Sequence, residues 1–323
     1  MYHILVNPSS CSGKGASMWK EVETYLKSEG IEHKVFFSER QGHVAELMRS
    51  ITEEHVSDPE PVNVIILGGD GTLDEALQGI ADFDKVNIGY IPTGSSNDFA
   101  RALNWHGSPM ELLKRILACK EPARLDLGRL KYEQMSDERS RVFKGTVPTF
   151  RFFDVSCGIG FDAAICEEAL SADSKSFLNR IGLGKLTYLV ICLKQLFGAK
   201  LTGGMLILDN DEKVTFKKMR FIVGMNTCYE GGGFKFAPKA DPTDGYLDIC
   251  AVSDISTPGV LLALPGATKG NHVKHKKIRM YRVKSYEVIM DDPVWVHTDG
   301  EVYTKASHIK VSVLPGKLRL LVT

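Results

Sequence analysis

Residues 67–75 read LGGDGTLDE, and their types are those of a phosphate-binding turn. The glycines Gly68, Gly69 and Gly71 let the backbone approach a phosphate closely and point N–H groups toward it. An apolar run typical of a buried strand precedes the turn, and a helical pattern follows it. Because the start of a helix carries partial positive charge, the pattern favours phosphate binding over a bare turn.

The polar side chains of this turn allow two interpretations. Asp70 would repel bare phosphates, but it suits a site where a magnesium ion or its water lies between carboxylate and phosphate. Alternatively, Thr72 is the N-cap of the following helix and Glu75 completes a capping box. A cap and a phosphate site can coexist, so both interpretations stay open.

Two more polar turns follow predicted strands. In PTGSSNDFA, residues 92–100, Gly94 frees the backbone while Ser95 and Asn97 offer polar groups to a nucleotide. A helix start capped by Asn97 or Asp98 explains the same residues equally well. The segment NPSSCSGKG, residues 7–15, lacks the first glycine and the Ser/Thr of a Walker loop, so we interpret it as a polar turn that faces a nucleotide through Asn7.

The elements that must position these turns alternate between short apolar runs and helical patterns, which is typical of βα units and a parallel sheet. Ligands of such sheets collect at the carboxyl ends of the strands, where all three turns lie. The predicted elements are the strands Tyr2–Val6, Val35–Phe37, Val62–Leu67 and Ile88–Ile91 and a helix over Ala16–Glu29.

Beyond Pro122 the pattern changes to strands joined by polar turns such as MSDERS, which indicates a mostly antiparallel domain. We predict an α/β nucleotide-binding domain over residues 1–123, a mainly β substrate domain over residues 124–315, and an active site in the cleft between them. Residues 316–323 are candidates to complete the first domain. The predicted strands are Arg124–Tyr132, Arg141–Lys144, Phe150–Ser156, Met205–Asp209, Val214–Val223 and Ile278–Met290, with a helical segment from Phe161 to Leu196.

The composition excludes several classes of protein. A length of 323 residues suits two domains, and 40 basic residues balance 40 acidic ones, so no overall charge recruits nucleic acid. Seven scattered cysteines without a C-x-x-C pair argue against a disulfide framework or a zinc site and for the reducing cytoplasm. We see neither a secretory signal pattern nor an unbroken apolar segment that would span a bilayer.

In order and spacing, the three turns resemble the catalytic domain of the diacylglycerol kinase family, most closely its soluble bacterial lipid kinases. The resemblance covers nearly the whole chain, although the GGDGT turn alone is shared with NAD kinases and 6-phosphofructokinases. It implies an NAD kinase/diacylglycerol kinase-like α/β domain beside the β domain. The further matching segments are Arg124–Asp126, Gly158–Asp162, Ala237–Pro238, Asp244–Gly245 and Asp299–Glu301.

The resemblance implies an ATP-dependent lipid kinase that transfers the γ-phosphoryl group to a lipid hydroxyl, most simply converting diacylglycerol to phosphatidic acid. An alcohol is a poor nucleophile at neutral pH, so the reaction needs a base. By resemblance Glu301 is this base and Asp299 supports it. Without the resemblance, Asp299 and Gly300 would indicate only a hairpin turn.

Metal sites are also implied. Asp70, Asp98 and Asp126 match the acidic residues that organise a catalytic Mg²⁺, with Asp126 acting through water. Three carboxylates beside ATP would repel it without such a cation.

A second, structural Mg²⁺ or Ca²⁺ position matches the segment DPTDGY, residues 241–246. The carboxylate of Asp244 and the backbone carbonyls of Asp241 and Tyr246 would be its ligands. A plain turn explains this segment as well, because P-x-D-G is strong turn chemistry.

The resemblance further implies which residues contact the nucleotide. Ser38 and Ser95 stand where the family more often has Thr, and both keep the hydroxyl. The implied nucleotide-binding residues are Asn7, Ser38, Gly68, Gly69, Asp70, Gly71, Thr72, Glu75, Gly94, Ser95 and Asn97.

The lipid would reach the second domain from a membrane surface, so we expect a cytoplasmic protein and leave peripheral association with the inner membrane face, and a homodimer, open. An apolar helical stripe could border an acyl-chain groove or belong to the core. A basic run could contact anionic lipid or water. The stripe comprises Leu186, Leu189, Val190, Leu193, Leu196 and Phe197, and the basic run comprises Lys269, Lys274, Lys276, Lys277, Arg279, Arg282 and Lys284.

Two alternatives to a lipid kinase stay open. An NAD kinase-like small-molecule kinase shares the GGDGT turn, but it does not explain the GSSNDFA segment or Asp299–Glu301. A non-catalytic nucleotide- or lipid-binding regulator would not need the acidic residues or the base.

Overall fold

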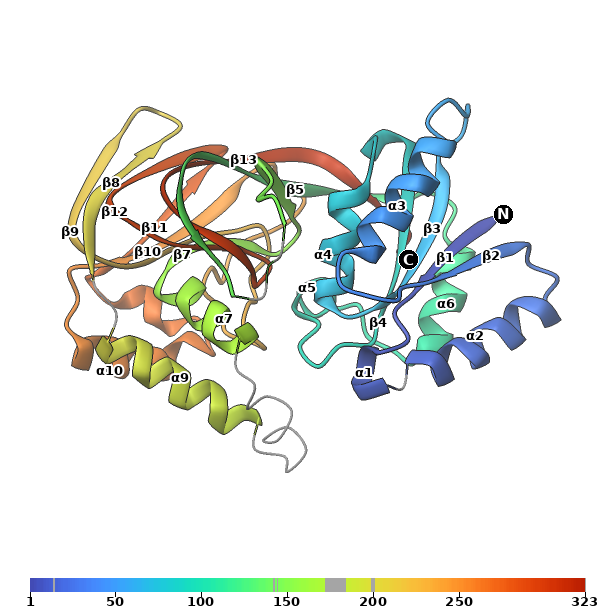
Figure 1. The fold of residues 1–323 in the computed structure, drawn as a ribbon, viewed down its shortest axis with the longest axis horizontal. Coiled ribbons are helices and arrows are strands. Elements are labelled where there is room, and N and C mark those ends of the chain that lie inside the picture. Colours follow the sequence, from blue (N-terminus) through green and yellow to red (C-terminus); the bar gives the residue numbers. More distant parts are fainter. Residues whose placement is uncertain (14, 142, 144, 172–183, 199–200, 323) are drawn as a thin grey trace.

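The computed structural model describes residues 1–13, 15–141, 143, 145–171, 184–198 and 201–322. The chain forms two parts that lie side by side (Figure 1). Two long strands, β5 (Ala123–Arg139) and β13 (Glu301–Leu320), run between the parts. The chain begins and ends in the first part (Figure 1).

The first part contains parallel strands in the order β4-β3-β1-β2. Its central strands are apolar, and Ile65, Ile66 and Leu67 are fully buried. Strands buried on both faces are typical of a parallel sheet that helices cover on both sides. The strands are β1 (Tyr2–Val6), β2 (His33–Phe37), β3 (Val62–Gly68) and β4 (Val86–Pro92). The predicted strands are thus confirmed, β1 with the same bounds and the other three with slightly longer ones.

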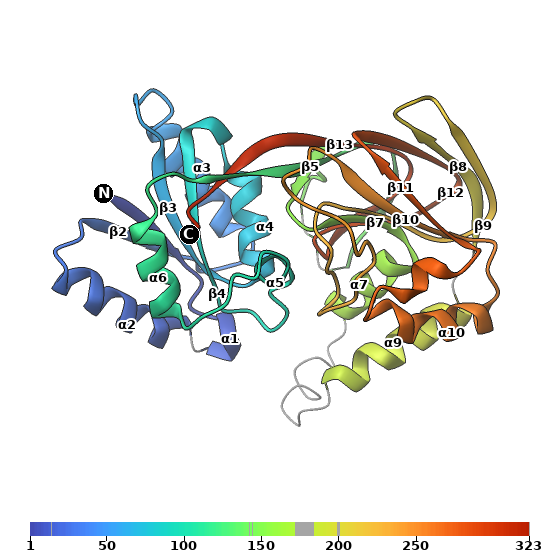
Figure 2. The same cartoon turned by 180° about the vertical axis from the view of Figure 1, so that it is seen from behind.

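Helices cover both faces of this sheet (Figures 1 and 2). Helices α3 and α4 pack together on one face, and α2 and α6 pack together on the other. The helix predicted over Ala16–Glu29 is confirmed as α2, and Trp19, Val22 and Leu26 form its buried apolar face. The helices are α1 (Ser10–Gly13), α2 (Gly15–Ser28), α3 (His43–Glu54), α4 (Asp70–Gly79), α5 (Asp98–Ala102), α6 (Pro109–Ala118) and the 3₁₀ turn η1 (Phe83–Lys85).

The second part is built mainly from antiparallel strands in the order β11-β10-β9-β7-β12-β13. Strand β8 pairs with both β9 and β12, while β5 pairs with β13 and β6. In β12, the buried Tyr286, Val288 and Met290 alternate with more exposed residues, as expected of a strand with one face on a core. The remaining strands are β6 (Phe150–Phe153), β7 (Ser156–Gly160), β8 (Thr202–Leu208), β9 (Lys213–Met225), β10 (Leu247–Ser253), β11 (Ile278–Val283) and β12 (Ser285–Thr298).

Helices α9 and α10 lie at the lower edge of the second part in both views, and α7 lies between α9 and the strands (Figures 1 and 2). Leu196 of α9 and Val260 of α10 belong to one buried apolar cluster, which holds these helices against the sheet. Within the described residues, no helix combines the length and the apolar character needed to cross a bilayer. The helices are α7 (Phe161–Ser171), α9 (Gly184–Gly198), α10 (Thr257–Ala267) and the 3₁₀ turn η2 (Asn271–Lys274).

The end of the chain ties the two parts together. β13 pairs with β5 along most of its length, and Leu320 pairs in parallel with Ile88 of β4. The N–H of Leu321 also donates to the carbonyl of Ile88 at 2.7 Å. One sheet therefore runs through both parts, and the division after residue 123 stays a prediction.

Several predicted elements of the second part are wrong. Most of MSDERS lies in β5 rather than in a turn, because pairing with β13, for example of Met135 with Ala306, overrides its polar composition. Arg141 and Phe143, the described residues of a predicted strand, are not in a strand. The predicted helical segment contains two helices, α7 and α9, and its residues 172–183 lie outside the described part. Sequence patterns did not predict β10 or α10.

Candidate active site

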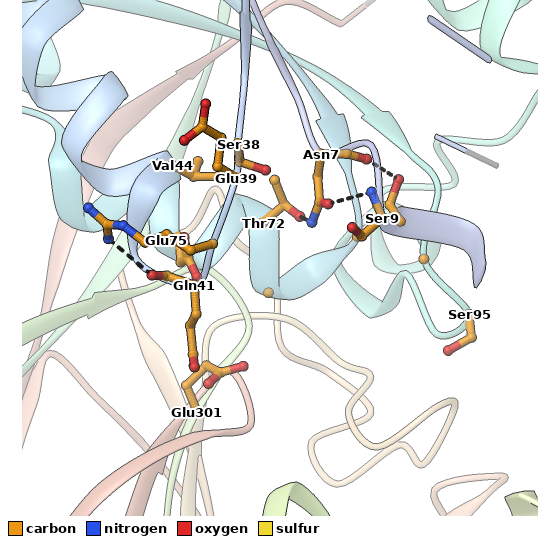
Figure 3. Close-up of a pocket in the computed structure, with 15 residues that line it drawn as sticks. Asn7, Ser9, Ser38, Glu39, Gln41, Val44, Thr72, Glu75, Ser95 and Glu301 are labelled. Carbon is orange, nitrogen blue, oxygen red and sulfur yellow. Dashed lines mark hydrogen bonds between the residues drawn. The ribbon is translucent and has the colours of Figure 1, made fainter. Parts of the chain in front are cut away.

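The three polar turns meet at the carboxyl ends of β1, β3 and β4, where they line a cavity of about 550 Å³ (Figure 3). Parallel strands end at one edge of a sheet, so turns far apart in sequence converge there. Glu301, at the start of β13, enters the cavity from the second part (Figure 3). The predicted site residues in the lining are Asn7, Ser38, Gly69, Gly71, Thr72, Glu75, Gly94, Ser95 and Glu301.

Two glycine turns touch each other beside this cavity. A Cβ at Gly69 would lie 3.1 Å from Cα of Gly94, and a Cβ at Gly94 would lie 2.9 Å from Cα of Gly69. A Cβ at Gly68 would overlap the Thr72 side chain at 2.4 Å. Glycine therefore allows the two turns to pack directly. Helix α4 starts in the same place, and the first N–H groups of a helix have no partner within it.

The predicted capping box at the start of α4 is wrong. The Asn7 amide donates to Thr72 Oγ1 at 3.0 Å, and Glu75 Oε1 accepts from the N–H of Gly42 at 2.9 Å. Gly69 is the N-cap residue, without a side-chain cap. Thr72 thus connects α4 to the first polar turn, and Glu75 connects α4 to the start of α3, because tertiary partners replace the local cap.

Asn97 closes the second polar turn on itself. Its Oδ1 accepts from the N–H of Gly94 at 2.9 Å, and its Nδ2 donates to the carbonyl of Gly94 at 3.0 Å. Asn97 has a φ of 49°, a left-handed conformation that Asn tolerates well. The Asn97 side chain therefore shapes the turn, whereas Ser95 lines the cavity.

Asp70 and Asp98 form an acidic pair beside the cavity. The N–H of Asp98 donates to Asp70 Oδ2 at 3.3 Å, whereas Asp70 Oδ1 is buried without a hydrogen-bond partner among the described residues. Burial and the charge of Asp98 raise the pKa of Asp70 to about 6. Burial also raises the pKa of Asp98, whose carboxylate accepts from the N–H of Gly232 at 2.8 Å. An unpartnered buried carboxylate oxygen suits a hard cation such as Mg²⁺.

Asp299 fixes the turn between β12 and β13. Its carboxylate accepts from three successive backbone N–H groups, those of residues 154–156, at distances of 3.0, 3.0 and 2.8 Å. These bonds hold Glu301 beside the glycine-rich turn, with Oε1 3.4 Å from where a Cβ at Gly71 would lie. Burial, and then the charge of Asp299, raise the pKa of Asp154 well above its usual range.

A buried ion pair connects α4 to the same turn. Arg151 of β6 donates to both carboxylate oxygens of Asp74 at 2.7 and 2.6 Å, and its Nε donates to Thr298 Oγ1 at 2.7 Å. The two charged side chains are only 3% and 0% exposed. The guanidinium also lies 4.2 Å from the ring centroid of Tyr303. Arg151 therefore links the glycine-rich turn to the turn that carries Glu301.

Family models match both parts of this architecture. Residues 1–130 match the diacylglycerol kinase catalytic domain, and residues 156–322 match the YegS C-terminal NAD kinase beta sandwich-like domain. The chain belongs to the diacylglycerol kinase catalytic-domain family. It is a kinase that transfers phosphate to an alcohol acceptor. The predicted family and the predicted enzyme class are thus confirmed.

Known diacylglycerol kinase relatives align over most of their length. A provisionally named lipid kinase, YtlR of Bacillus subtilis (strain 168), is 26% identical over 99% of this chain and 98% of its own. Diacylglycerol kinase of Staphylococcus carnosus (strain TM300) is 26% identical over 92% of this chain and 87% of its own. A crystal structure of a provisionally named diacylglycerol kinase from Bacillus anthracis str. Sterne has a TM-score of 0.73 at 20% identity, covering 100% of this chain and 97% of that one. It shows that the fold is shared.

In this member of the diacylglycerol kinase family, the carboxylate of Asp126 holds two backbone segments. It accepts from the N–H groups of Gly245 at 2.6 Å and Gly316 at 2.8 Å. Burial raises its pKa, with smaller contributions from the charges of Asp244 and Asp241. No hydrogen bond in the described part of the chain joins it to Asp70 or Asp98, so its catalytic role stays a prediction.

Arg282 supplies positive charge at the predicted second metal position. Its Nη2 lies 2.7 Å from Asp244 Oδ2, and its guanidinium lies 4.6 Å from the ring centroid of Tyr246. The other oxygen of Asp244 accepts from the N–H of Tyr246 at 3.0 Å, and Asp241 Oδ1 accepts from the N–H of Thr243 at 3.0 Å. Both Asp244 oxygens have protein partners, so a cation bound there would have to displace Arg282, and the second metal site stays a prediction.

Sequence reasoning missed Arg40, which lines the cavity together with Ser38. Among the described lining residues it is the only Lys or Arg, and it pairs at 2.6 Å with Glu46, both side chains being well exposed. Exposed ion pairs are weak, so the guanidinium can turn toward an anionic ligand. Its place in the sequence could have identified Arg40, because it lies in the turn after β2. The carboxyl end of β2 is a fourth strand end at the same edge of the sheet.

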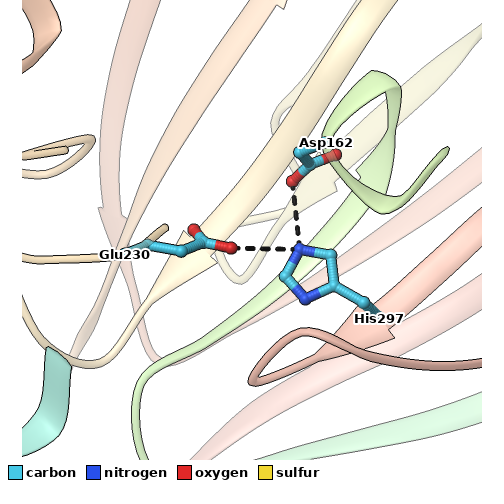
Figure 4. Close-up of side chains that lie close together, drawn as sticks. All are labelled: Asp162, Glu230 and His297. Atoms are coloured by element: carbon cyan, nitrogen blue, oxygen red, sulfur yellow. Dashed lines mark hydrogen bonds and ion pairs between the residues drawn. The ribbon is translucent and has the colours of Figure 1, made fainter. Parts of the chain in front are cut away.

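A group of ionisable side chains beside the turn that carries Glu301, with a fully buried histidine, was also missed (Figure 4). His297 Nε2 lies 3.2 Å from Asp162 Oδ2 and 3.1 Å from Glu230 Oε1, a set of atoms compact enough to surround a metal ion. However, His297 Nδ1 accepts from the N–H of Gly300 at 3.1 Å, so Nε2 carries the ring proton. A nitrogen that carries a proton cannot ligate a metal, and we interpret the group as a hydrogen-bonded support for the turn before Glu301.

Proposed function

We propose that this protein transfers the γ-phosphoryl group of ATP to the hydroxyl group of diacylglycerol, which yields phosphatidic acid. The observation that carries the proposal is the cavity in which the strand-end turns of one part face Glu301 of the other. This arrangement combines backbone groups suited to phosphates with a carboxylate suited to an alcohol. Membership of the diacylglycerol kinase family implies ATP as the donor.

The phosphates of ATP would lie against the start of α4 and the Gly94 turn. Free N–H groups and the partial positive charge of a helix start favour an anion there. Asn7, Ser38 and Ser95 place polar groups in the same cavity. Arg40 is the cation that can approach the phosphates once it leaves Glu46.

Mg²⁺ fits beside Asp70 and Asp98. Asp70 Oδ1 is buried and unpartnered among the described residues, and repulsion between the two acids favours a cation near them. When bound, Mg²⁺ would neutralise charge on the phosphoryl oxygens. We assign Asp70 Oδ1 to holding this ion, while Asp98, whose oxygens accept from the N–H of Gly232 and from Arg101, would lie beside it.

Glu301 would act as the general base. Its carboxylate takes the proton of the acceptor hydroxyl while the hydroxyl oxygen forms a bond to the γ-phosphorus. The bond from the γ-phosphorus to the bridging oxygen breaks, and ADP leaves. Asp299 and Arg151 would contribute by fixing the turn that carries Glu301.

The acceptor is tested with labelled ATP, Mg²⁺ and a panel of micellar lipids that includes diacylglycerol, a sphingoid base, a long-chain alcohol and a glycolipid, with NAD in a parallel reaction. We expect label in phosphatidic acid. Label in another lipid would overturn diacylglycerol as the acceptor, and label only in NAD would overturn a lipid acceptor altogether.

The base is tested with Glu301→Gln, which keeps the size of the side chain and removes its basicity. We expect kcat to fall by roughly 10²–10⁴ while ATP binding measured by calorimetry stays unchanged. The matched control is Glu121→Gln, a change of an exposed glutamate outside the cavity lining. Turnover of Glu301→Gln at the rate of the control would contradict the assignment.

A further inference from the structure

Helix α10 is an apolar helix on the surface of the molecule. Its sequence, TPGVLLALPGA, contains no charged residue. Leu262 is 84% exposed and Leu261 is 36% exposed. A helix without a polar face is normally buried, so this exposure indicates that an apolar environment covers α10 in the working protein.

Helix α9 exposes further apolar side chains. Phe197 is 72% exposed, Val190 is 58% exposed and Leu193 is 36% exposed. Their spacing of three and four residues places them on one face of the helix. Of the predicted apolar stripe, only Leu196 is buried among the side chains that the structure describes, and the side chains of Leu186 and Leu189 lie outside the described part.

The buried Arg220 holds the end of α9 beside the start of α10. Its guanidinium donates to the carbonyl of Leu196 at 3.4 Å, to that of Ile255 at 3.3 Å and to Thr257 Oγ1 at 2.9 Å. Both views show the two helices together at the lower edge of the molecule (Figures 1 and 2). The exposed apolar side chains of α9 and α10 therefore belong to one region of the surface.

Exposed lysines flank α10 at both of its ends. Before the helix, the N–H groups of Lys217 and Lys218 donate to Asp254 Oδ1 at 3.3 and 3.1 Å, which places both residues next to the start of α10. After the helix come the exposed Lys269 and Lys274, followed by Lys276 and Lys277. In the described part of the chain, none of these lysines forms an ion pair with a carboxylate.

The charge of the segment that contains α10 is of one sign, although Asp254 directly precedes it and Arg282 within it pairs with Asp244. Residues 255–286 contain seven Lys or Arg and no Asp or Glu, whereas the whole chain has 40 of each sign. Such a segment attracts an anionic surface although the molecule as a whole is neutral.

We propose that α10 and the exposed face of α9 insert into the headgroup region of a membrane that contains anionic phospholipid, with the flanking lysines on its phosphates. The inference rests on the proposed function, because a diacylglycerol acceptor resides in such a membrane. Apolar side chains reach the acyl boundary while lysine ammonium groups stay at headgroup level. A protein partner would need an apolar patch with acidic groups at both ends, whereas an anionic bilayer offers this combination everywhere.

This face lies on the same side of the molecule as one edge of the cavity (Figures 1 and 2). Helices α9 and α10 lie at the same lower edge as α1, whose first residue, Ser10, lines the cavity (Figures 1 and 2). Docking through α10 would therefore turn one side of the molecule toward the bilayer. This is the side where the strand-end turns meet.

The proposal is tested by co-sedimentation of the full chain with vesicles, without ATP or diacylglycerol, so that binding is measured independently of the reaction. Vesicles of equal parts phosphatidylcholine and phosphatidylglycerol are compared with vesicles of phosphatidylcholine alone. We expect binding to the anionic vesicles that weakens with added salt. Leu262→Asp should weaken this binding about tenfold or more, because a charge then replaces the most exposed apolar side chain.

Two control variants distinguish this surface from the rest of the molecule. Val56→Asp places the same charge at an exposed apolar residue of the first part and should bind like the unchanged protein. The pair Lys269→Gln and Lys274→Gln should weaken binding several-fold and reduce its salt dependence, whereas Lys20→Gln with Lys120→Gln should not.

Equal binding of Leu262→Asp and Val56→Asp would overturn the proposal, as would equal binding to neutral and anionic vesicles. Self-association that Leu262→Asp abolishes, without vesicle binding by the unchanged protein, would instead assign the surface to a second copy of the chain.

Phosphorylation of a dispersed short-chain diacylglycerol should be the same for Leu262→Asp and Val56→Asp. If neither the unchanged protein nor the variants phosphorylate this diacylglycerol, the proposed function is overturned. The proposed membrane surface is then still decided by vesicle binding alone.

Discussion

Asp70 shows how a single residue in this protein trades stability for function. Its carboxylate is buried next to Asp98, and one of its oxygens has no hydrogen-bond partner among the described residues. Nothing in the folding of the chain requires an acid there, whereas a site for a cation and phosphates does. Such residues are expected to cost stability while no ligand is bound.

We predict that Asp70→Asn stabilises the ligand-free protein at neutral pH and removes activity. Burial and Asp98 raise the pKa of Asp70 from 3.8 to about 6, so the folded state holds this proton more tightly than the unfolded state does. The stability that this proton provides is full below pH 3.8 and is lost as the pH rises through about 6. Asparagine is uncharged at every pH and so keeps this stability, which amounts to a gain of up to about 3 kcal/mol in the free energy of unfolding above pH 7.

Urea unfolding with a chelator present, followed from pH 4 to pH 8, measures this difference. The two proteins should be nearly equal at the acid end and diverge toward the neutral end. A difference in the free energy of unfolding between the two proteins that does not change with pH would show that ionisation of Asp70 is not its cause.

At the same scale, local sequence patterns identified the backbone turns but not their side-chain partners. Gly69, Gly94 and Asn7 could be assigned to the site because glycines and polar residues after strands have local meaning. Arg151 could not, because its partner Asp74 is 77 residues away and its partner Thr298 is 147 residues away. The capping box failed for the same reason, since Thr72 and Glu75 have distant partners.

Among the elements, β6, α4 and the turn after β12 act as a unit through Arg151. The guanidinium makes a two-point contact with Asp74 and a third bond to Thr298, all away from water. A buried ion pair contributes little net stability compared with apolar residues, but removal of one partner leaves an uncompensated charge.

We predict that Arg151→Met destabilises the protein by about 3–5 kcal/mol, because Asp74 is left buried without its cation. Asp74→Leu combined with Arg151→Met should recover most of this loss but not full activity, because the bond to Thr298 beside the Glu301 turn stays broken. Chemical unfolding and steady-state kinetics of the single and the double variant separate stability from positioning. The exposed pair of Lys131 and Glu133 is the control, and Lys131→Met should change stability little. A double variant as unstable as Arg151→Met would contradict this account.

Elements were predictable where one periodicity dominated. The parallel strands are continuous apolar runs, and α2 has a clear helical face. Helix α10 was missed because its two prolines and two glycines indicate a loop and its apolar residues surround the whole helix without a polar face. The feature that hid this helix from pattern analysis is the one that suggests a membrane surface.

For the whole molecule, the arrangement of the two parts depends on β13, which leads the chain from the second part back to the first. β13 pairs with β5 of the second part and reaches β4 of the first at Leu320, while the pair of Arg151 and Asp74 crosses between the parts. This topology could only be suggested from the sequence, because the pairing of Leu320 with Ile88 joins residues 232 positions apart. Parts joined only by a flexible linker would move and unfold separately.

We therefore predict that both parts unfold in one transition. Trp19 and Trp105 are buried in the first part, and Trp295 lies in β12 of the second, so tryptophan fluorescence can follow each part alone. Trp295→Phe reports on the first part, and Trp19→Phe with Trp105→Phe reports on the second. For each reporter variant, the urea midpoint from fluorescence is compared with the midpoint from circular dichroism of the same variant. The two fluorescence midpoints, corrected in this way for the effect of the substitutions, should coincide. Leu320→Ala should lower both midpoints together, because the cavity it creates lies in the shared sheet and costs about 2–5 kcal/mol. Two separate transitions in the unsubstituted background would mean that β13 connects the parts without coupling them.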